Sequence, residues 1–440
     1  MKRNTINIVS LGCSKNLVDT ERLMRRLTDA GYNVTFEHTP DQRPLPETTV
    51  VNTCGFIGDA KEESIDTILE WGQLRTAGKI KNLMVMGCLS ERYRKELPEQ
   101  IPEVDRWYGK YDWDGMIADL GFGPMGSTPY DRVITTPSHH AYLKISEGCN
   151  RFCAFCAIPL ITGRHHSRSI EEIEREVKLL TSRGVSEFNV IAQDLSAYGT
   201  DFTEPTADGR SYLATLVDRI ADIDGVKRIR LHYAYPADFP LDLLDVMAAR
   251  PNVCRYLDIA LQHASDNMLT AMRRHIDLEA TRRLLAEIRR RVPGIHIRTT
   301  MMVGFPGETD DDFRQLLDFV KEQRFEHMGA FAYCEEEGTY AALHLQDDVD
   351  PDTKQARLDQ LLELQQQIAL ELNEAKVGQT LQVVIDREED DFYVGRTEFD
   401  SPEVDPEVLI GKRCKLQPGQ YVDVRVTEAL PFELLAEVAD

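Results

Sequence analysis

Apolar and polar positions follow a strand–helix rhythm along the first part of the chain. Short apolar runs at 6–11, 49–52 and 82–86 have the length of buried strands, and a turn and then a helical pattern follow each of them. Strands that alternate with helices are typical of a parallel sheet. The pattern therefore predicts an N-terminal parallel α/β domain.

A second strand–helix series predicts a barrel. Candidate strands lie at 142–146, 187–192, 228–232, 256–261, 296–303 and 327–333. Helical patterns lie between them, for example at 170–183 and 278–291. Six strand–helix units are fewer than the eight that close a full barrel, so we expect an open, partial (βα)6 barrel.

The pattern changes twice more toward the C-terminus. An amphipathic helix is predicted at 352–375. Its apolar face is predicted to contain Leu358, Leu361, Leu362, Gln365, Ile368, Ala369 and Leu372. Beyond it, short strands at 380–385, 392–395 and 421–429 alternate with turn signals, which is typical of a small β-barrel or sandwich.

These patterns together predict an α/β protein of three domains. We expect the N-terminal domain at 5–122, the partial barrel at 135–372 and the small all-β domain at 375–440. A chain of 440 residues is long enough to give each domain its own core.

Composition adds little to the fold but bears on location. Hydrophobic content of 42% and charged content of 28% are ordinary for a soluble globular protein. No apolar run reaches the length that a bilayer requires, and the first residues lack the apolar stretch of a signal peptide. We therefore expect a cytoplasmic protein with no membrane partner.

The charge favours a basic partner over nucleic acid. The formal net charge is −23, and residues 376–440 contain 15 acidic and 7 basic residues. Phosphate contacts need lysine and arginine, so an acidic domain suits a positively charged protein better than RNA. The alternative is that this acidity only keeps the domain soluble.

Nine cysteines in a cytoplasmic chain indicate ligands or reactive thiols rather than disulfides. Six stand in conspicuous places: Cys13, Cys54, Cys88, Cys149, Cys153 and Cys156. Cys254, Cys334 and Cys414 are isolated, and we expect them to be buried as small apolar side chains.

Three of the conspicuous cysteines each follow a predicted strand and precede a predicted helix. These are Cys13, Cys54 and Cys88. Ligands of open α/β sheets bind beyond the carboxyl ends of the strands, so the three thiols are expected to converge on one crevice. A nearby helix N-terminus also favours the thiolate that metal binding requires.

The other three form the run Cys149–Cys153–Cys156, spaced CxxxCxxC, after the first strand of the predicted barrel. Active sites of parallel barrels lie at that end of the strands. Thiolates suit zinc or iron–sulfur clusters, but zinc sites usually pair CxxC units or add histidine. Three local cysteines without a fourth favour a [4Fe–4S] cluster with one iron open to a substrate.

This run resembles the signature of the radical S-adenosylmethionine superfamily. The resemblance implies that Cys149, Cys153 and Cys156 are catalytic and hold a [4Fe–4S] cluster whose open iron binds S-adenosyl-L-methionine. It also implies that one electron from the cluster cleaves this cofactor to methionine and a 5′-deoxyadenosyl radical.

The resemblance extends to one family within that superfamily. The segments SLGCSKNLVD at 10–19, VNTCGFI at 51–57 and MGCL at 86–89 look like the N-terminal domain of methylthiotransferases. In that family three N-terminal cysteines hold a second [4Fe–4S] cluster that carries the sulfur to be inserted. The resemblance implies this role for Cys13, Cys54 and Cys88. It also implies that the C-terminal β-domain is a substrate-binding TRAM domain.

Methylthiotransferases act chiefly either on transfer RNA or on a ribosomal protein. Segments that look like the ribosomal-protein branch, the RimO type, are KNLVD at 15–19, CGFI at 54–57, QD at 193–194, YGTD at 198–201 and LQH at 261–263. The implied substrate is the β-carbon of an aspartate in small-subunit ribosomal protein S twelve, free or in the assembled subunit. An electron donor such as a flavodoxin-like protein is also implied.

Two other functions stay open at this point. A transfer-RNA adenosine methylthiotransferase would share the chemistry and differ in the substrate that gains sulfur and methyl. An iron–sulfur electron carrier or scaffold that docks on the ribosome would bind clusters without cleaving S-adenosyl-L-methionine. The position of CxxxCxxC at a barrel mouth argues against a carrier.

Six residues are candidates for the S-adenosyl-L-methionine neighbourhood, four of them polar residues that end the second and fourth predicted strands of the barrel. They are Gln193, Asp194, Gln262, His263, Arg298 and Gly304. Arg298 is a candidate counter-ion for the cofactor carboxylate, with a structural ion pair as the alternative. The segment GFPGET at 304–309 matches no phosphate-binding fingerprint, and we expect a tight turn with Glu308 and Thr309 near a helix start.

Overall fold

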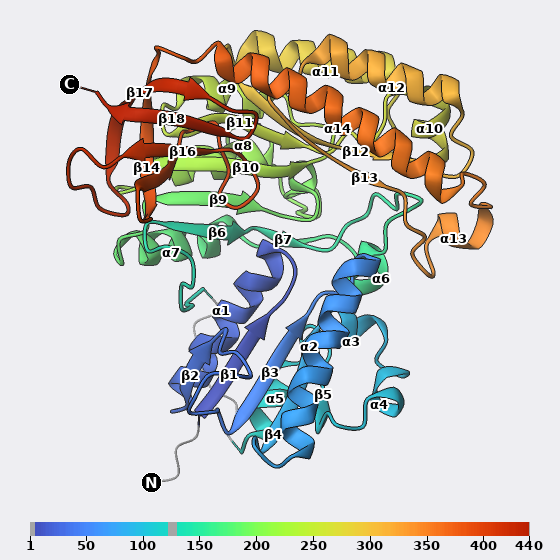
Figure 1. The fold of residues 1–440 in the computed structure, drawn as a ribbon, viewed down its shortest axis with the longest axis vertical. Helices are drawn as coiled ribbons and strands as arrows, with labels where there is room; N and C mark the ends of the chain where they lie inside the picture. Colours follow the sequence, from blue (N-terminus) through green and yellow to red (C-terminus); the bar gives the residue numbers. More distant parts are fainter. Residues whose placement is uncertain (1–4, 122–129, 440) are drawn as a thin grey trace.

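The computed structural model describes residues 5–121 and 130–439, which form three units that meet at one centre (Figure 1). The first unit is a five-stranded parallel sheet with the order β2-β1-β3-β4-β5. Its strands are β1 (Thr5–Ser10), β2 (Asn33–Phe36), β3 (Thr48–Thr53), β4 (Asn82–Gly87) and β5 (Arg106–Trp107). The predicted parallel sheet is confirmed. The pattern does not predict the edge strands β2 and β5, because they are short and only partly buried.

Helices cover both faces of this sheet. They are α1 (Ser14–Asp29), α2 (Gly58–Thr76), α3 (Cys88–Arg92), α4 (Leu97–Gln100) and α5 (Trp113–Asp119). Side chains alternate along each strand, so Ile8 packs with Leu23 of α1 on one face, whereas Val51 packs with Ile68 of α2 on the other. Two separate apolar layers therefore hold the sheet between its helices.

The second unit is an open sheet of six parallel strands with the order β13-β12-β11-β10-β9-β6, which confirms the predicted partial barrel. The strands are β6 (His140–Lys144), β9 (Glu187–Ile191), β10 (Arg228–Ala234), β11 (Val253–Ile259), β12 (His296–Val303) and β13 (His327–Ala332). The outer helices are α7 (Ile170–Thr181), α8 (Tyr212–Ala221), α9 (Asp242–Ala249), α10 (Asp266–Ala271), α11 (Leu278–Arg291) and α12 (Asp310–Gln323). Short elements at the mouth are β7 (Ser146–Glu147), α6 (Ile158–Thr162), β8 (His166–Ser167), η1 (Leu195–Ala197) and α13 (Tyr340–His344).

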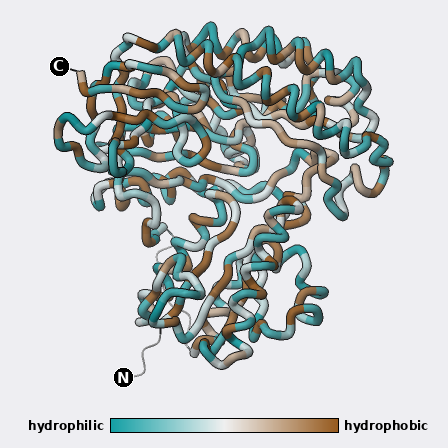
Figure 2. The backbone as a smooth tube through the Cα atoms, in the orientation of Figure 1, coloured by the Kyte–Doolittle hydropathy of each residue, from teal (hydrophilic) through white to brown (hydrophobic). Residues whose placement is uncertain are grey.

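The largest apolar core lies between these strands and the outer helices, which present hydrophilic residues outward (Figure 2). Helix α14 (Pro351–Glu374) closes this layer and buries Leu361, Gln365 and Ile368, as its amphipathic pattern predicts. The prediction is wrong for Leu362, which is 39% exposed. Successive residues on a helix point about 100° apart, so the neighbour of Leu361 turns away from the core.

The third unit is a closed five-stranded barrel with the order β14-β15-β16-β18-β17. Its strands are β14 (Thr380–Glu388), β15 (Phe392–Arg396), β16 (Glu407–Gly411), β17 (Tyr421–Ala429) and β18 (Glu433–Val438). The sequence pattern does not distinguish a β-barrel from a β-sandwich, and the structure shows a barrel. Strands β16 and β18 are absent from the prediction because their apolar residues form only short alternating runs between charged ones.

One loop of the third unit enters the partial barrel from the amino-terminal ends of its strands. We call residues 397–405, between β15 and β16, the plug loop. Arg230 of β10 donates hydrogen bonds of 3.2 Å to the carbonyl oxygens of Thr397 and Glu398. Asp405 accepts one of 2.7 Å from the hydroxyl of Tyr256 in β11. The polar barrel interior is thus satisfied by a loop far away in sequence.

The three isolated cysteines differ in burial. Cys254 lies buried in β11 as predicted, but Cys334 and Cys414 are exposed, so the prediction is wrong for these two. Both exposed cysteines lie in loops, one after β13 and one between β16 and β17, where no strand or helix holds a side chain in the core.

Two findings concern the limits of the chain and its surroundings. The predicted domain boundary at residue 122 and the predicted end at residue 440 lie outside the described residues. Among the helices in 5–121 and 130–439, none combines the length and the apolar character that a membrane crossing requires.

Candidate active site

We call Cys13, Cys54 and Cys88 the first triad, and the structure places all three at one edge of the N-terminal sheet. Cys13 lies between β1 and α1, Cys54 follows β3, and Cys88 is the first residue of α3 after β4. Strands β1, β3 and β4 are neighbours in the sheet, so their carboxyl ends lie side by side. The three thiols therefore border one crevice.

Two glycines allow the backbones of the first triad to approach one another. A Cβ at Gly12 would lie 2.7 Å from both Cβ and Sγ of Cys54, and one at Gly55 would lie 2.7 Å from the backbone nitrogen of Leu89. Gly12 also has a φ of +88°, a conformation that other residues rarely adopt. Glycine is thus required next to the ligand positions if the thiols are to share one space.

Burial and charge set the protonation of these thiols. Burial raises the pKa of Cys88 to about 12 and also raises the pKa of Cys54. Burial opposes ionisation of Cys13 as well, but the Lys15 ammonium and the backbone N–H of Asn16 hold its pKa below the ordinary value. Cys13 is nevertheless solvent-exposed. The Cys13 thiol therefore borders a solvent-accessible space that is surrounded by other parts of the protein.

This donor set fits an iron–sulfur cluster better than a single metal ion. Within residues 5–121 and 130–439, no three His, Cys, Asp or Glu side chains converge closely enough to hold one ion. A [4Fe–4S] cluster takes one thiolate on each iron, so its ligands stand farther apart than those of a tetrahedral zinc ion. Three thiols bordering an open space match the larger group.

We call Cys149, Cys153 and Cys156 the second triad, which follows β6 and β7 at the carboxyl end of the partial barrel. Its loop is fixed at several points. Gly148 turns the chain with a φ of +74°, and a Cβ there would lie 2.1 Å from the carbonyl oxygen of Arg164. The backbone N–H of Cys149 donates to Gly163, and that of Ala154 donates to Met272.

Arg274 and Tyr235 surround the thiol of Cys153. Arg274 donates from Nη1 to the Cys153 Sγ at 3.1 Å, and the Tyr235 hydroxyl lies 3.8 Å from the same sulfur. Tyr235 also donates a hydrogen bond of 2.7 Å to the carbonyl oxygen of Arg274. Burial raises the pKa of Cys149 to about 11 and that of Cys156 to about 12, so a cation at this triad favours the ionised form that metal binding needs.

Asp194, one of the predicted cofactor neighbours, lies beside the second triad. Its Oδ2 accepts a 2.6 Å hydrogen bond from Arg151 Nε, while Oδ1 is buried with no hydrogen-bond partner in the described residues. Arg151 also pairs with Asp238 at 2.9 Å and lies over the ring of Tyr235 at 4.3 Å. The loop of the second triad is thereby tied to the ends of two further strands.

Gln193 and Gln262 also present polar atoms at the mouth. Gln193 donates 2.8 Å from Nε2 to Glu147, and its Oε1 is buried without a partner among the described residues. Gln262 has a φ of +76°, and its Oε1 is buried and unpaired in the same part of the chain. Buried polar atoms of this kind usually have a partner, so both positions remain candidates for cofactor contact.

His263 and Gly304 lie beside Glu308, and His263 Nε2 is buried without a hydrogen-bond partner in the described residues. Glu308 accepts 2.8 Å from the backbone N–H of Gly304 and lies 3.4 Å from His263 Nε2. Arg357 of α14 neutralises this carboxylate at 2.8 Å. The expected tight turn is present, and Thr309 caps α12 through a capping box with Asp312. These contacts tie β12 to the helix layer.

Arg298 lies away from both triads. It donates 3.1 Å from Nε to Asp405 of the plug loop and lies 3.6 Å from Asp258 of β11. Its surroundings are those of a structural ion pair, the alternative role considered for this residue. Arg298 stands near the amino end of β12, whereas the triads stand at carboxyl ends, and the sequence alone does not reveal the plug loop that pairs with it.

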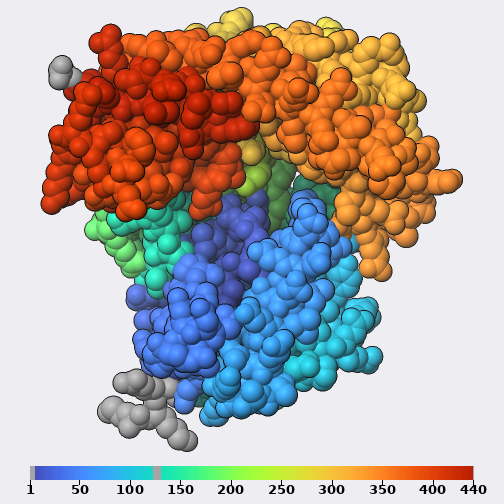
Figure 3. Space-filling view, viewed as in Figure 1, coloured from blue at the N-terminus to red at the C-terminus, as the bar shows by residue number. Residues whose placement is uncertain are grey.

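One ionic network joins the elements that carry the two triads. Lys144 of β6 pairs with Asp19 of α1 and with Glu147, and Lys110 lies 3.6 Å from each of the same two carboxylates. Helix α3, which begins at Cys88, packs against α6, which begins shortly after the second triad. Leu17 and Val18 of α1 further dock onto β6. In Figure 3 the surface is hollowed where the three units meet.

Sequence analysis missed Arg274, Lys110 and Lys144, because the pattern around a basic residue does not show which distant side chains it will contact. Asp19, which pairs with Lys144, lies in the segment 10–19 that resembles the methylthiotransferases. Only the fold places these side chains at the triads.

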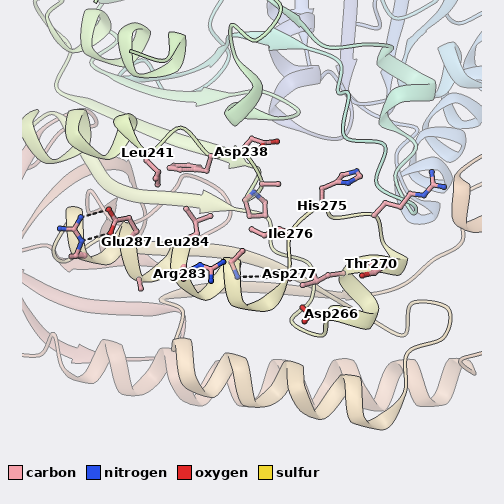
Figure 4. A pocket seen from close by; sticks show the side chains of 18 residues that line it. Asp238, Leu241, Asp266, Thr270, His275, Ile276, Asp277, Arg283, Leu284 and Glu287 are labelled. Atoms are coloured by element: carbon pink, nitrogen blue, oxygen red, sulfur yellow. Dashed lines mark hydrogen bonds and ion pairs between the residues drawn. The ribbon is translucent and has the colours of Figure 1, made fainter. Parts of the chain in front are cut away.

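A cavity of about 1130 Å³ lies behind the second triad, on the outer side of the partial barrel (Figure 4). Asp238, Ile276 and Leu284 are among its lining residues. Ala237 and Ile276 pack in an apolar cluster with Cys153, so they separate the cavity from the triad. The cavity therefore lies outside the barrel mouth, on the other side of the residues that separate it from the second triad.

Comparison with known proteins identifies the family. The protein of Bacteroides thetaiotaomicron called ribosomal protein uS12 methylthiotransferase RimO is 56% identical over 439 residues, which covers 100% of this chain and 99% of the relative. The chain belongs to the family of uS12 methylthiotransferases. Members from Phocaeicola vulgatus and Flavobacterium johnsoniae are 57% and 46% identical and are likewise matched over 100% of this chain.

Models of three constituent families match successive parts of this uS12 methylthiotransferase family member. The model of Uncharacterized protein family UPF0004 matches residues 5–109, that of the Radical SAM superfamily matches 143–320, and that of the TRAM domain matches 377–439. They coincide in order with the sheet, the partial barrel and the closed barrel.

Solved structures share the fold at low identity. The radical S-adenosylmethionine methyltransferase TsrM from Kitasatospora setae has a TM-score of 0.56 at 15% identity, covering 74% of this chain and 72% of its own. The cobalamin-dependent S-adenosylmethionine radical enzyme OxsB has a TM-score of 0.52 at 13% identity, covering 83% and 56%. At these identities the likeness concerns the arrangement of the elements.

Proposed function

We propose that this chain transfers a methylthio group to the β-carbon of an aspartate side chain in ribosomal protein uS12. One observation carries the proposal: two cysteine triads lie at the carboxyl ends of parallel strands, and the elements that carry them are joined by one ionic network of Asp19, Lys110, Lys144 and Glu147. A reaction that makes a carbon radical and then adds sulfur to it needs two centres that reach the same carbon. The family relationship over the full chain supports the same function.

Each triad would hold one [4Fe–4S] cluster and leave one iron without a protein ligand. When bound, the clusters and S-adenosyl-L-methionine supply the electron, the radical, the sulfur and the methyl group. The first triad would hold the cluster that carries sulfur, and the second triad the cluster that activates S-adenosyl-L-methionine. We assign the sulfur-carrying cluster to the domain at 5–122, the radical chemistry to 135–372 and substrate binding to 375–440. The matched family models lie within these limits.

The chain's own residues would orient and insulate this chemistry. Arg274 would stabilise the Cys153 thiolate by a charge-assisted hydrogen bond. Arg151 would hold the loop of the second triad to Asp194. The unpaired oxygens of Gln193 and Gln262 would accept hydrogen bonds from S-adenosyl-L-methionine. Buried side chains at the mouth exclude water, which would otherwise quench a radical.

Charge supports a basic protein substrate. The net charge of −23 and the acidic C-terminal barrel suit a ribosomal protein, free or within the small subunit, better than transfer RNA. A one-electron donor protein of flavodoxin type would reduce the second cluster, and the cytoplasm, where ribosomal proteins are assembled, would be the site of action.

The test is an anaerobic reaction of reconstituted enzyme with reductant and S-adenosyl-L-methionine. It offers uS12 and unmodified transfer RNA side by side, with mass spectrometry of both. A methylthio mass gain on an aspartate of uS12 is expected. A gain on RNA alone would move the enzyme to the transfer-RNA branch. Bound clusters without any 5′-deoxyadenosine would indicate a carrier and overturn the proposal.

A further inference from the structure

Lys15 occupies an unusual position between the two triads. It lies in the first turn of α1, two residues after Cys13, and is only 9% exposed. Its Nζ stands 3.3 Å from the ring centroid of Tyr233, which lies near the carboxyl end of β10. The neighbouring residues Leu17 and Val18 pack on the same tyrosine and on β6. The ammonium group thus points from the N-terminal sheet into the mouth of the partial barrel.

Lys15 has no carboxylate within ion-pair distance in the described part of the chain. Within residues 5–121 and 130–439, no carboxylate forms an ion pair with its Nζ and no acceptor takes a hydrogen bond from it; besides the tyrosine ring, its charge acts on the Cys13 thiol and, at longer range, on Asp258. The other buried lysines of the described chain all have a carboxylate partner. Lys110 and Lys144 share Asp19 and Glu147, and Lys354 pairs with Asp347 at 2.6 Å. Lys15 is the exception in this group.

The carboxylate of Asp258, on which the charge of Lys15 acts, is already engaged. Asp258 of β11 accepts a hydrogen bond of 3.2 Å from the backbone N–H of Tyr233 and faces Arg298 at 3.6 Å. An aromatic face stabilises a buried ammonium less than a carboxylate does, and a buried charge without a partner is costly. A cation held in this way is prepared for an anion that arrives from outside the chain.

We propose that Lys15 binds the carboxylate of the substrate aspartate and thereby positions its β-carbon between the two triads. The inference rests on the proposed function. The carboxylate carbon of aspartate is bonded directly to the β-carbon, so an ammonium that holds the carboxylate fixes the reacting methylene within one bond. A lysine acts as a compact point charge with strong donors, which suits a single carboxylate. An asparagine at the same place offers no charge to pair with it.

The same contact explains why a lysine stands so close to a metal-binding cysteine. A positive group beside Cys13 brings the anionic end of the substrate toward the first triad, while Tyr233 keeps the ammonium aligned in the absence of substrate. Two otherwise unconnected features, the lack of a carboxylate partner among the described residues and the position over a barrel tyrosine, then serve one task.

The experiment compares the reconstituted wild-type enzyme with Lys15→Met and Lys15→Arg. Lys227→Met is the matched control, because Lys227 also lies over a tyrosine ring, at 4.9 Å from Tyr421, but far from the triads. Each enzyme receives uS12 carrying the target aspartate or an asparagine in its place. The readouts are iron content, 5′-deoxyadenosine, methylthiolated product, and KM and kcat for uS12.

We expect Lys15→Met to raise the KM for aspartate-bearing uS12 by about tenfold or more and to reduce product by a further factor of about ten. 5′-Deoxyadenosine formed without uS12 should stay within about twofold of wild type, because the contacts of the second triad are unchanged. Lys15→Arg should recover part of the loss, and Lys227→Met should match wild type. The wild-type enzyme should prefer uS12 with aspartate over uS12 with asparagine, and Lys15→Met should lose this preference. The change in the enzyme and the change in the substrate each remove the same contact between ammonium and carboxylate.

Each other outcome has a definite meaning. An unchanged aspartate preference in Lys15→Met overturns the inference and leaves the proposed function intact. Loss of iron or of 5′-deoxyadenosine in that variant would assign the lysine to the first triad or to the cofactor, and the inference would be wrong. Absence of product on uS12 from the wild-type enzyme would overturn the proposed function and the inference with it.

Discussion

Arg274 donates a hydrogen bond of 3.1 Å to the sulfur of Cys153, although 121 positions separate the two residues in the chain. Arg274 is almost completely buried, and its guanidinium also lies over the ring of Tyr235 at 4.2 Å. The fold therefore places a buried cation at one thiol of the second triad. Hydrogen bonds to the sulfurs and nearby charge are the means by which a protein sets the potential of an iron–sulfur cluster.

Replacement of this arginine should change the redox behaviour of the second cluster. Reduction adds negative charge, which Arg274 stabilises, so Arg274→Met should lower the reduction potential by on the order of 60 mV, equivalent to a tenfold change in a one-electron equilibrium. Redox titration followed by electron paramagnetic resonance measures this shift. Arg273→Met is the control, because the adjacent Arg273 lies over Tyr340 and is exposed. Equal potentials in the two variants would contradict the role given to Arg274.

Substitutions in the two triads should have different effects. Changing any one of Cys149, Cys153 or Cys156 to alanine should abolish 5′-deoxyadenosine formation, by a factor of about 100 or more. Changing Cys13, Cys54 or Cys88 should spare this cleavage and stop methylthiolation. Either set should lower iron from about eight to about four per chain.

The control for the triads is Cys414→Ala, because this thiol is exposed and isolated. It should leave iron content, cleavage and product unchanged. Product from an enzyme that lacks one thiol of the first triad would show that sulfur does not pass through that crevice.

The contrast between what the sequence predicts and what it misses has a physical basis. The strand ends that carry Cys13, Cys54 and Cys88 are visible because a strand, a turn and a helix are encoded locally. The plug loop is invisible because its partners, such as Arg230 and Thr397, are brought together only by the docking of one folded unit on another. Arg298 shows the consequence: its type and place suggest a cofactor ligand, and a distant carboxylate takes it instead.

Removal of Asp405 should loosen the docking of the plug loop. Asp405 accepts hydrogen bonds from Tyr256 at 2.7 Å, from Arg298 at 3.1 Å and from the backbone of Ser401 at 2.8 Å, and its side chain is 1% exposed. Asp405→Ala should lower the free energy of unfolding by about 3 kcal/mol, because it leaves the buried Tyr256 hydroxyl without its acceptor and the largely buried Arg298 with only Asp258 as a partner. Urea denaturation measures the change.

Glu407→Ala provides the comparison for Asp405. Glu407 pairs with Arg387 at the surface, where both side chains are partly exposed, so its removal should cost less than about 1 kcal/mol. Similar losses in the two variants would mean that the plug loop contributes no more than a surface ion pair.

His140 should make the protein less stable in mild acid. It is the first residue of β6 and faces His139, Glu187, Asp386 and Arg396, and burial, followed by the charge of Arg396, lowers its pKa from 6.5 to about 3. The unfolded chain takes up the proton below pH 6.5 while the folded chain resists it down to about pH 3, so stability falls with pH in this window. Between pH 7 and pH 5 the loss from this group is about 2 kcal/mol.

His140→Phe tests this linkage, because it keeps an aromatic ring without a titratable group. The free energy of unfolding of the variant, measured by urea denaturation at both pH values, should depend on pH less than that of wild type by the same amount. Parallel pH profiles for the two proteins would show that His140 is protonated equally in the folded and unfolded states.

Gly12 and Gly31 provide a matched pair that isolates the geometry of the first triad. Both have a φ of +88°, so an alanine at either position incurs the same backbone strain of about 1 kcal/mol. They differ in surroundings: a Cβ at Gly12 would lie 2.7 Å from the Sγ of Cys54, whereas one at Gly31 would meet nothing within 4 Å. Gly12→Ala should therefore displace Cys54 and lower iron by about half, with 5′-deoxyadenosine formation retained and methylthiolation lost. Gly31→Ala should lose only the strain energy and keep its full iron content. If Gly12→Ala bound as much iron as Gly31→Ala, the close approach of Cys13 and Cys54 would not be a requirement of the first cluster.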